Sequence, residues 1–561
     1  MARLALILLC FTAICLLNGH PRAGAEQPPM PPQAVRVKPS QADPPRFVLG
    51  TRVVPIKLPR PDSYLLTDSL TVSPDLSSVA YRHRFGVELD REGIALNSDN
   101  ILSIDRATDP TLSPDGQSIA TVCNNDGWLM MLNRKRWDGY DPVTPVRFSP
   151  DGRRMIYLAR EEHQRFVVEY DWRHPVCDAV DWDRLIFTPD SSVLAYPAKI
   201  GNQWHMMVNG DPGPGWDRIV SPVVTAEAGP SAFYVALRAG RYHVADRHTA
   251  GPGFRMIHSA PAVSDDGRVF AYWAMGDDFR WRVIRNHKPV SGLVAEKPGQ
   301  LILSPDGQTL AATFKRDDLW HVAFRGRLIG SYASIGQGSL LLSPDSRHVA
   351  YAIHQPAGWT VMLDDTPLAA LPRLAVNGIR FSPSGDRLVC VAGTSHGWHV
   401  WEKPIADPSD SNTAPNSQIK HRVYEAIDVK SLTFSPDGKH LAYLAERSGR
   451  SVVVRGGEEL GEYERAAHLT FDPTSEYLAY TGSLDGAWQV FVNGMPTGET
   501  FDELLPTAGI IFHKPDRCRT LALRHPGPEL IRVEVVIKPD DSHDPTPADG
   551  PDPSLAGVES P

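Results

Sequence analysis

The chain has 561 residues, of which 42% are hydrophobic and 22% are charged, an ordinary composition for a soluble globular protein. Its formal net charge of −9 argues against a nucleic-acid partner, because an acidic surface repels a polyanion. The 44 glycines and 50 prolines indicate many turns and exclude a mainly helical fold.

The first residues predict a secretory signal peptide over 1–25. Arg3 precedes an almost unbroken apolar run over 4–17, and Ala23-Gly24-Ala25 has the small-x-small pattern of a cleavage site. The run is shorter than the roughly 20 residues that span a bilayer, although an uncleaved anchor is the alternative. No later segment is apolar enough to cross a membrane. We therefore expect an exported mature chain without a membrane span, periplasmic or extracellular.

Two segments that flank the rest of the mature chain are rich in proline. Residues 26–61 are expected to form an extended Pro-rich linker. Residues 539–561 combine Asp and Pro with few large apolar side chains, which predicts a disordered acidic tail.

Between these flanks a five-residue motif recurs. Leu-Ser-Pro-Asp-Gly or Phe-Ser-Pro-Asp-Gly occurs at 112–116, 148–152, 303–307 and 434–438, and looser copies fill the intervals. The serine or its equivalent stands at positions 73, 113, 149, 188, 225, 264, 304, 343, 382, 435, 472 and 513. Every interval is 36 to 41 residues except the one of 53, which contains a polar insertion at 406–418 that we interpret as a surface loop. Twelve repeats of this length predict propeller blades.

Each repeat is consistent with four strands. In the unit 430–467, strands are expected at 430–434, 440–445, 451–455 and from 462. The Ser-Pro-Asp-Gly segment between the first two is a type I turn, in which proline presets φ and aspartate can bond nearby N–H groups. The chain is thus expected to be an all-β propeller of about twelve four-stranded blades.

An aromatic residue recurs about 16 positions after each motif. The tryptophans in register are Trp128, Trp204, Trp281, Trp320, Trp359, Trp398 and Trp488. We expect them to be buried between neighbouring blades, where a large ring contributes much apolar area. An exposed binding platform is the alternative.

The Ser-Pro-Asp-Gly, Leu-Ala-Tyr and Trp-x-Val pattern resembles the TolB-like, WD-like β-propeller repeats of exported bacterial proteins. The resemblance covers roughly residues 65–538 and implies a fold more than a function. The segment before the repeats is too short to supply the separate N-terminal domain of TolB-like proteins. Their partner binding is therefore not carried over to this chain.

How the blades divide into rings is a separate question. Propellers usually have four to eight blades, which favours two six-bladed rings over 62–295 and 296–538. Seven plus five blades and one large ring are the alternatives. The last repeat has only three strands, and the segment around 63–66 could supply the fourth, which would tie the chain ends together.

Four cysteines follow the signal peptide, at Cys123, Cys177, Cys390 and Cys518. They are far apart and have no zinc-ligand spacing, so we interpret them as buried thiols, with disulfides as the alternative.

Three patterns could suggest chemistry. Residues 393–397 match the GxSxG nucleophile elbow, but no helix is expected after them, as that turn requires. His205, His243, His321 and His399 share one offset in different blades, so they are spaced around a ring and cannot meet at one ion. The motif aspartates are interpreted as turn residues. We expect no catalytic residue, no metal site and no cofactor.

Two functions remain open. We expect a non-catalytic scaffold that binds a protein, peptide or glycan; the alternative is a propeller enzyme, a polysaccharide hydrolase or lyase with its site in a central channel. The residue five before each motif serine should lie where the chain enters the channel. The first half of the chain carries most polar residues at this offset, which gives a candidate ligand site. Its residues are Asp68, Thr108, Thr144, Asp183 and Ser259.

Overall fold

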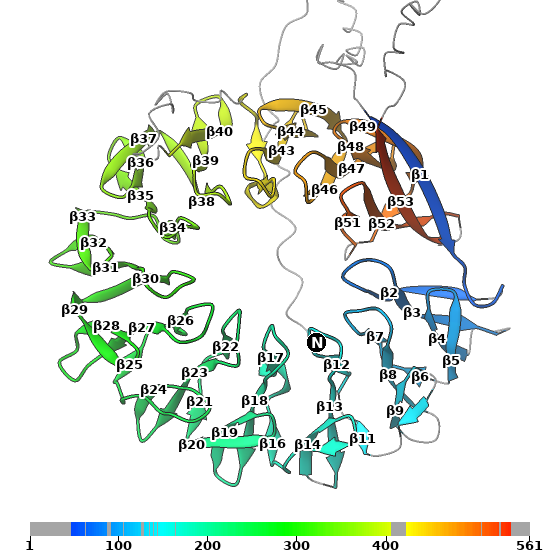
Figure 1. Cartoon of the computed structure of the whole chain (residues 1–561), viewed down its shortest axis with the longest axis horizontal. Coiled ribbons are helices and arrows are strands. Elements are labelled where there is room, and N and C mark those ends of the chain that lie inside the picture. The colour runs from blue at the N-terminus through cyan, green and yellow to red at the C-terminus, as the bar shows by residue number, and fades with distance from the viewer. Residues whose placement is uncertain are drawn as a thin grey trace, which may run out of the picture. The chain divides into compact units, whose positions relative to one another are not determined.

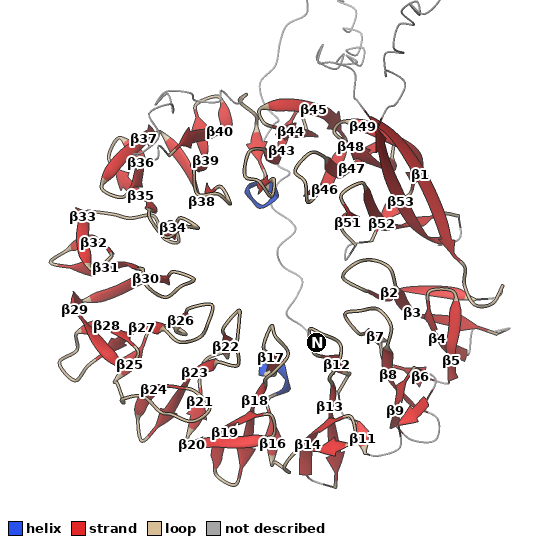
Figure 2. Ribbon diagram, viewed as in Figure 1, coloured by secondary structure: helices blue, strands red, loops and turns tan. Residues whose placement is uncertain are grey.

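The computed structural model describes residues 47–539, apart from 62, 87–90, 105, 125–127, 134, 138–139, 143, 163, 406–421, 506–507 and 527–528. The described chain is almost entirely β-strand. It forms twelve antiparallel sheets, or blades, which follow one another around a ring in sequence order (Figures 1 and 2). The expected all-β propeller is therefore confirmed.

The innermost strand of each blade faces the centre of the ring (Figure 1). In seven blades it is divided into two short pieces that pair with the same second strand. In blade order, the innermost strands are β2 (Tyr64–Val72), β6 (Arg106–Ala107) with β7 (Thr111–Leu112), β11 (Asp141–Pro142) with β12 (Arg147–Phe148), β16 (Ala179–Val180) with β17 (Ile186–Phe187), β21 (Arg218–Ile219) with β22 (Val224–Thr225), β25 (Met256–Ile257) with β26 (Ala262–Val263), β30 (Lys297–Leu303), β34 (Leu341–Leu342), β38 (Arg373–Phe381), β41 (Ala426–Ile427) with β42 (Thr433–Phe434), β46 (Arg465–Phe471), and β50 (Glu503–Leu504) with β51 (Ile511–Lys514).

The second and third strands form a hairpin in every blade. The second strands are β3 (Val79–Phe85), β8 (Ile119–Asn124), β13 (Met155–Glu161), β18 (Leu194–Ile200), β23 (Ala232–Arg238), β27 (Phe270–Met275), β31 (Leu310–Arg316), β35 (Val349–Gln355), β39 (Arg387–Thr394), β43 (Leu441–Arg447), β47 (Leu478–Leu484) and β52 (Arg517–Arg524). The third strands are β4 (Arg91–Leu96), β9 (Trp128–Leu132), β14 (Gln164–Glu169), β19 (Gln203–Val208), β24 (Arg241–Ala245), β28 (Trp281–Arg285), β32 (Leu319–Phe324), β36 (Gly358–Leu363), β40 (Gly397–Pro404), β44 (Arg450–Arg455), β48 (Ala487–Val492) and β53 (Glu529–Pro539).

Ten blades have a fourth, outermost strand. These strands are β5 (Asp99–Ile104), β10 (Lys135–Trp137), β15 (Trp172–Arg173), β20 (Asp211–Trp216), β29 (Lys288–Ala295), β33 (Arg327–Tyr332), β37 (Thr366–Leu371), β45 (Glu458–Tyr463), β49 (Met495–Phe501) and β1 (Phe47–Ile56). Among the described residues, blades 5 and 9 have three strand positions only. The expectation of four strands per blade therefore holds for most blades, not for all.

Twelve clusters of buried apolar side chains hold the ring together, one at each junction between neighbouring blades. One cluster joins Trp273 of blade 6 to Phe314 of blade 7, and another joins Leu523 of blade 12 to Tyr81 of blade 1. Two six-bladed rings would instead leave blades 6 and 7 unpacked against each other. The twelve blades thus form one ring, which was the alternative to the favoured boundary near Ala295. Repeat spacing does not distinguish the two because it is set within a blade, whereas ring size is set between blades.

The ring is closed by a strand from the other end of the chain. β1 pairs antiparallel with β53 over ten residues, from Phe47 opposite Pro539 to Ile56 opposite Leu530 (Figure 1). A clasp was expected, but from 63–66, which instead lie in and beside the start of β2. The linker expected over 26–61 is therefore wrong for 47–56, whose apolar residues pack on blade 12. The signal peptide, residues 26–46 of that linker and residues 540–561 of the expected tail lie outside the described residues, whereas Pro539 is the last residue of β53.

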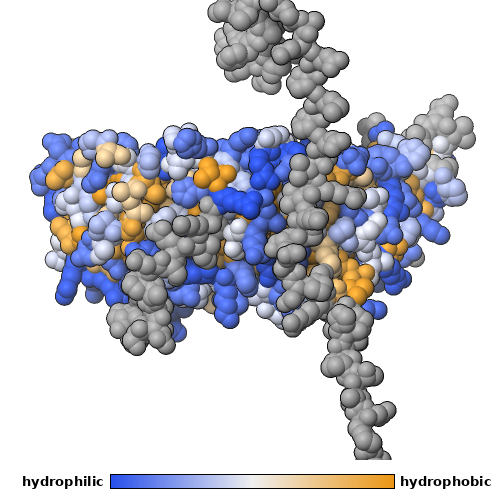
Figure 3. All heavy atoms as spheres, turned by 90° about the horizontal axis from the view of Figure 1, so that it is seen from above, coloured by the Kyte–Doolittle hydropathy of each residue, from blue (hydrophilic) through white to orange (hydrophobic). Residues whose placement is uncertain are grey.

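Most of the recurring tryptophans are less buried than expected. Trp281 is 7% exposed, whereas Trp204, Trp320, Trp359, Trp398 and Trp488 are half-buried. The side chain of Trp128 lies outside the described residues. The edge-on view of the ring shows a largely hydrophilic surface with small separate apolar patches (Figure 3). Within the described ranges, no helix is long and apolar enough to cross a bilayer.

Candidate functional site

The innermost strand is interrupted at the same point in every blade, and we call this segment the inner bulge. In β2 the pairing with β3 shifts register between Leu66 and Thr71, and β38 does the same between Ala375 and Arg380. In divided strands the bulge is the segment between the two pieces. In blades 4 and 10 it contains a 3-10 turn, η1 (Trp182–Arg184) and η2 (Val429–Ser431) (Figure 2). Bulges at sheet edges commonly redirect side chains out of the ladder.

All five predicted ligand residues lie on inner bulges. Asp68, Asp183 and Ser259 are exposed, while Thr108 and Thr144 are half-buried. In chain order, Asp68, Thr108, Thr144, Asp183 and Ser259 belong to blades 1, 2, 3, 4 and 6. The offset from the motif therefore selected equivalent positions, but on five different blades, so they line an arc of the ring and do not converge on one point.

Thr108 and Thr144 have a structural role. The Thr108 hydroxyl accepts the Val122 N–H at 3.2 Å, and the Thr144 hydroxyl accepts the Leu158 N–H at 3.1 Å. Each bond supplies an acceptor to a second-strand N–H that the bulged inner strand no longer reaches. The same bond recurs in other blades through Ser69, Ser221, Ser339 and Ser431. These hydroxyls therefore maintain the bulge, and Asp68, Asp183 and Ser259 remain as the exposed members of the predicted site.

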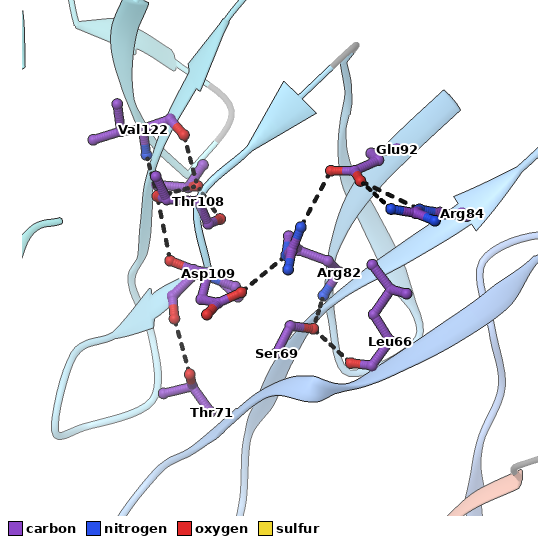
Figure 4. A network of polar contacts seen from close by, with 11 residues as sticks. Leu66, Ser69, Thr71, Arg82, Arg84, Glu92, Thr108, Asp109 and Val122 are labelled. Carbon is purple, nitrogen blue, oxygen red and sulfur yellow. Dashed lines mark hydrogen bonds and ion pairs between the residues drawn. The ribbon is translucent and has the colours of Figure 1, made fainter. Parts of the chain in front are cut away.

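A charged network connects the first two bulges (Figure 4). The Arg82 guanidinium on β3 lies 2.9 Å from Asp109 on the bulge of blade 2 and 3.4 Å from Glu92 on β4. Arg84 also contacts Glu92, at 3.3 Å. The Arg82 side chain is 19% exposed and that of Glu92 12%, whereas the Asp109 carboxylate is 60% exposed. Asp109 thus presents a positioned carboxylate one residue beyond Thr108. The prediction from the sequence selected only the residue five before each motif serine and therefore missed Asp109.

The bulge of blade 4 is tied to both of its neighbours. Arg147 on β12 donates to the Leu185 carbonyl at 3.1 Å and lies over the Trp182 ring at 4.9 Å. Burial lowers the pKa of Arg147, and the negative charge of Asp183 opposes this shift. Arg184 in turn donates to the Ile219 carbonyl of blade 5 at 2.9 Å. Asp183 is therefore an exposed carboxylate on a rigidly held turn.

The motif aspartates are turn residues, as expected. In blade 10 the buried Ser435 hydroxyl donates to Asp437 at 2.6 Å and accepts the His440 N–H at 2.9 Å, while Asp437 accepts the Lys439 N–H at 3.0 Å. The hydrogen bond from Ser435 is the main cause that lowers the pKa of Asp437 to about 2. Equivalent bonds occur at Asp75, Asp115, Asp151, Asp190, Asp306 and Asp345.

The other residues considered for chemistry are bound within their own blades. His205 and His243 each place Nδ1 2.8 Å from the carbonyl oxygen eight residues later, and His321 lies between the Arg316 carbonyl and the Ser331 hydroxyl. Ser395 of the GxSxG segment lies in the turn of the β39–β40 hairpin. No three His, Cys, Asp or Glu side chains gather as metal ligands in the part of the chain that the structure describes.

The four cysteines are free and buried, as predicted. Burial raises the pKa of Cys177 to about 11 and that of Cys390 and Cys518 to about 12. Their thiols therefore remain protonated, and none of these three is suited to nucleophilic chemistry.

Comparison with known proteins finds similar folds only. No known protein family matches the chain. No curated protein sequence matches it either. Solved structures similar to it include a eukaryotic initiation factor (13% identity, 64% of this chain and 96% of that one, TM-score 0.35), TolB from Acinetobacter baumannii (14%, 49% and 78%, 0.21) and the tricorn protease (13%, 77% and 46%, 0.21). At these identities and TM-scores the likeness says nothing of this chain's function.

Proposed function

We propose that the protein is an exported, non-catalytic propeller scaffold whose inner bulges bind a protein, peptide or glycan. The observation that carries the proposal is that recurring polar residues and variable polar residues have different environments. The motif serines and aspartates and the bulge hydroxyls, which recur from blade to blade, bond within their blades. The bulge residues that vary, including Asp68, Asp183 and Ser259, are exposed. A repeated frame with variable exposed side chains is how a binding surface is built on a propeller.

The spacing of these residues favours an extended ligand. Asp68 and Asp183 belong to blades 1 and 4, with Asp109 on blade 2 between them. A partner that touches all three must follow the arc of the ring, as a peptide segment, a protein loop or an oligosaccharide chain can. Each carboxylate would accept hydrogen bonds from amide, hydroxyl or cationic groups of such a partner.

The proposed compartment rests on the pattern of residues 1–25, with its basic start, apolar run and small-x-small site. N-terminal mass analysis of the exported protein tests it. A mature start at Glu26 supports the proposal, and retention of Met1 contradicts it.

The binding site itself is tested with immobilised peptide and oligosaccharide arrays. The chain is compared with the double variant Asp68→Asn/Asp183→Asn, which removes two charges without changing shape. The control is Asp485→Asn, an exposed turn residue with φ of 51° that asparagine tolerates. We expect the double variant to lose about tenfold or more in affinity for whatever the chain binds, because charge-assisted hydrogen bonds are lost. Equal binding by all three proteins contradicts a site at the bulges.

A further inference from the structure

The hairpin between β27 and β28 in blade 6 carries an unusually exposed aromatic residue. Phe279 is 64% exposed, and Met256 beside the same end of the blade is 49% exposed. The hairpin has five residues between Met275 and Trp281, whereas the corresponding turns of blades 7 and 8 have two. Phe279 therefore lies on a longer turn than those that follow it.

The backbone conformation at this position disfavours phenylalanine. Phe279 has φ of 58°, a left-handed conformation that is uncommon for bulky residues. The corresponding turns of other blades place small or polar residues at positive φ, as at Gly201, Ala239 and Ser448. An aromatic ring that is both conformationally strained and exposed to water is better explained by binding than by folding.

The charges around Phe279 are already paired within the chain. The Arg255 guanidinium lies over the ring at 4.2 Å, and Asp277 pairs with Arg241 of blade 5 at 2.8 Å. Arg280 pairs with Glu296 at 3.2 Å, and Arg282 makes two hydrogen bonds to Asp278. An apolar anchor inside a rim of neutralised charges is typical of a protein-binding hot spot.

The same face of the ring holds an apolar depression of about 460 Å³ between blades 7 and 8. Tyr332, Ala333, Ile353, Pro356 and Ala357 line it, with polar groups from Ser331, His354 and Gln355. It adjoins the blade 7 hairpin, because His321 bonds both Ser331 beside the depression and the Arg316 carbonyl at the start of that hairpin.

Blade 8 lacks a contact that several other blades make at this place. In blades 4, 5, 11 and 12 an acidic residue before the innermost strand accepts a hairpin N–H, through Asp178, Asp217, Glu464 and Asp502. In blade 8 the equivalent residue is Ala333, and the first turn residue is Pro356, which has no N–H. Blade 8 therefore has neither the carboxylate nor the amide N–H at this place, and its apolar surface there has no unsatisfied donor.

Blade 7 lies between the Phe279 hairpin and the depression, and its hairpin is self-complementary in charge. Lys315 and Arg316 are followed by Asp317 and Asp318, and then by Leu319, which is 41% exposed. Against a second copy related by a two-fold axis, the two cations of one hairpin face the two carboxylates of the other. The ion pairs now formed within the hairpin, at 3.3 and 3.7 Å, could be exchanged for pairs between copies.

We propose that the protein forms a two-fold dimer through the hairpin face of blades 6 to 8. Phe279 of each copy inserts into the depression beside Ala357 of the other, and the two blade 7 hairpins meet at the axis. The two-fold axis lies in the plane where the two hairpin faces meet, and it crosses the midpoint between Phe279 and the depression. Rotation about this axis brings Phe279 of each copy onto the depression of the other, so both contacts form at once. This interaction is separate from ligand binding at the inner bulges, and neither depends on the other.

Sedimentation velocity of the mature chain at about 1 to 100 µM, the range for interfaces of modest size, tests the dimer. We expect concentration-dependent dimerisation that Phe279→Asp and Ala357→Glu each weaken by about thirtyfold or more, as loss of a hot spot does. Leu484→Asp is the matched control, because Leu484 is 40% exposed at the equivalent hairpin of blade 11. A monomeric wild type overturns the proposal, as does a dimer that survives both substitutions.

Disulfide trapping tests the pairing directly and does not depend on the stability of charged variants. Phe279→Cys and Ala357→Cys proteins are mixed under mild oxidation. The four native thiols are buried and should not take part in the reaction. We expect a disulfide-linked heterodimer of the two variants. Phe279→Cys mixed with Leu484→Cys should give no more heterodimer than random collision. Equal yields in both mixtures overturn the proposed contact.

Discussion

The hydroxyl of Tyr332, on the outer strand of blade 7, lies 2.8 Å from the hydroxyl of Tyr351, on the second strand of blade 8. The tyrosine of the Leu-Ala-Tyr pattern thus reaches the outer edge of the preceding blade and hydrogen-bonds there. The same relationship joins Tyr480 to Tyr463, Tyr234 to Trp216 and Tyr196 to His174. Each bond satisfies a buried hydroxyl and fixes one blade against the next.

Tyr272 is an informative exception and provides a matched test. Its buried hydroxyl has no partner in the structure, because the facing residue of blade 5 is Phe254, with ring centroids 6.1 Å apart. We expect Tyr351→Phe to lower the free energy of unfolding by about 1–2 kcal/mol, since it leaves Tyr332 without its partner. Tyr272→Phe should be neutral or stabilising. Urea titration compares the two, and equal losses would mean that the interblade bond contributes nothing.

A second prediction concerns acid stability at the junction of blades 3 and 4. Burial raises the pKa of Glu169, but hydrogen bonds and charge from Arg154 and His174 outweigh it and hold the pKa at about 2, below the ordinary 4.5. Arg154 lies 2.7 Å and His174 3.5 Å from this carboxylate. The folded-state pKa is depressed, so the carboxylate stabilises the fold above about pH 4.5 and this contribution is lost as the pH falls towards 2.

Glu169→Gln is the variant that tests this. The difference in urea midpoint between wild type and Glu169→Gln should be largest near neutral pH and should shrink between about pH 4.5 and 2. Asp485→Asn, on an exposed turn, is the control and should show no such trend. If the difference in urea midpoint does not change with pH, ionised Glu169 and its partner Arg154 are not its cause.

The sequence predicts what lies within a blade better than what lies between blades. The motif spacing, the turn aspartates such as Asp437 and the buried cysteines follow from local rules and are found in the structure. Ring size, the β1 clasp and the Tyr332–Tyr351 bond depend on how two sheets meet, which a 40-residue period does not encode. Only the tyrosine pairing left a signal, because an aromatic residue precedes several of the second-strand tyrosines by 17 to 22 positions.

The sequence predicted where several inner bulges lie, but not which of their side chains are exposed. Counting back from the motif found the bulge in blades 1 to 4 and in blade 6, because the turn fixes the register of the inner strand. This counting could not show that the Thr108 hydroxyl accepts the Val122 N–H while the adjacent Asp109 is exposed. A bulge changes which side chains point away from the sheet, and the sequence does not show how.

Ring closure by β1 leads to a third prediction. Ile56 is 4% exposed and packs into the cluster that joins blades 12 and 1, whereas Val48 on the same strand is 53% exposed. Ile56→Ala should lower the free energy of unfolding by about 2–4 kcal/mol through lost burial and the cavity left behind. Val48→Ala should change it by less than about 0.5 kcal/mol. If urea titration finds an Ile56→Ala loss as small as that expected for Val48→Ala, the packing of the clasp does not contribute to stability.

The buried thiols give a fourth prediction. Because burial raises the pKa of Cys177, Cys390 and Cys518 to about 11 or 12, little thiolate forms near neutral pH and reagents cannot reach the sulfur. Intact-mass analysis after iodoacetamide should find all four cysteines, including Cys123, unmodified in the folded mature chain. The same treatment in denaturant should modify all four. Rapid labelling of the folded protein would contradict their burial.

The last prediction separates two tryptophans that occupy the same place in the repeat. Trp281 is 7% exposed inside the cluster between blades 6 and 7, so Trp281→Ala should cost about 3–5 kcal/mol. Trp320, in the next blade, is half-buried, with the Lys297 ammonium 5.8 Å from its ring. Trp320→Ala removes less buried area and should cost about 1–2 kcal/mol, including the weak cation–π contact. Urea titration of both variants measures the difference. If Trp320→Ala costs as much as Trp281→Ala, the burial of the tryptophan does not determine its contribution to the free energy of unfolding. Its position in the repeat would then predict that contribution better.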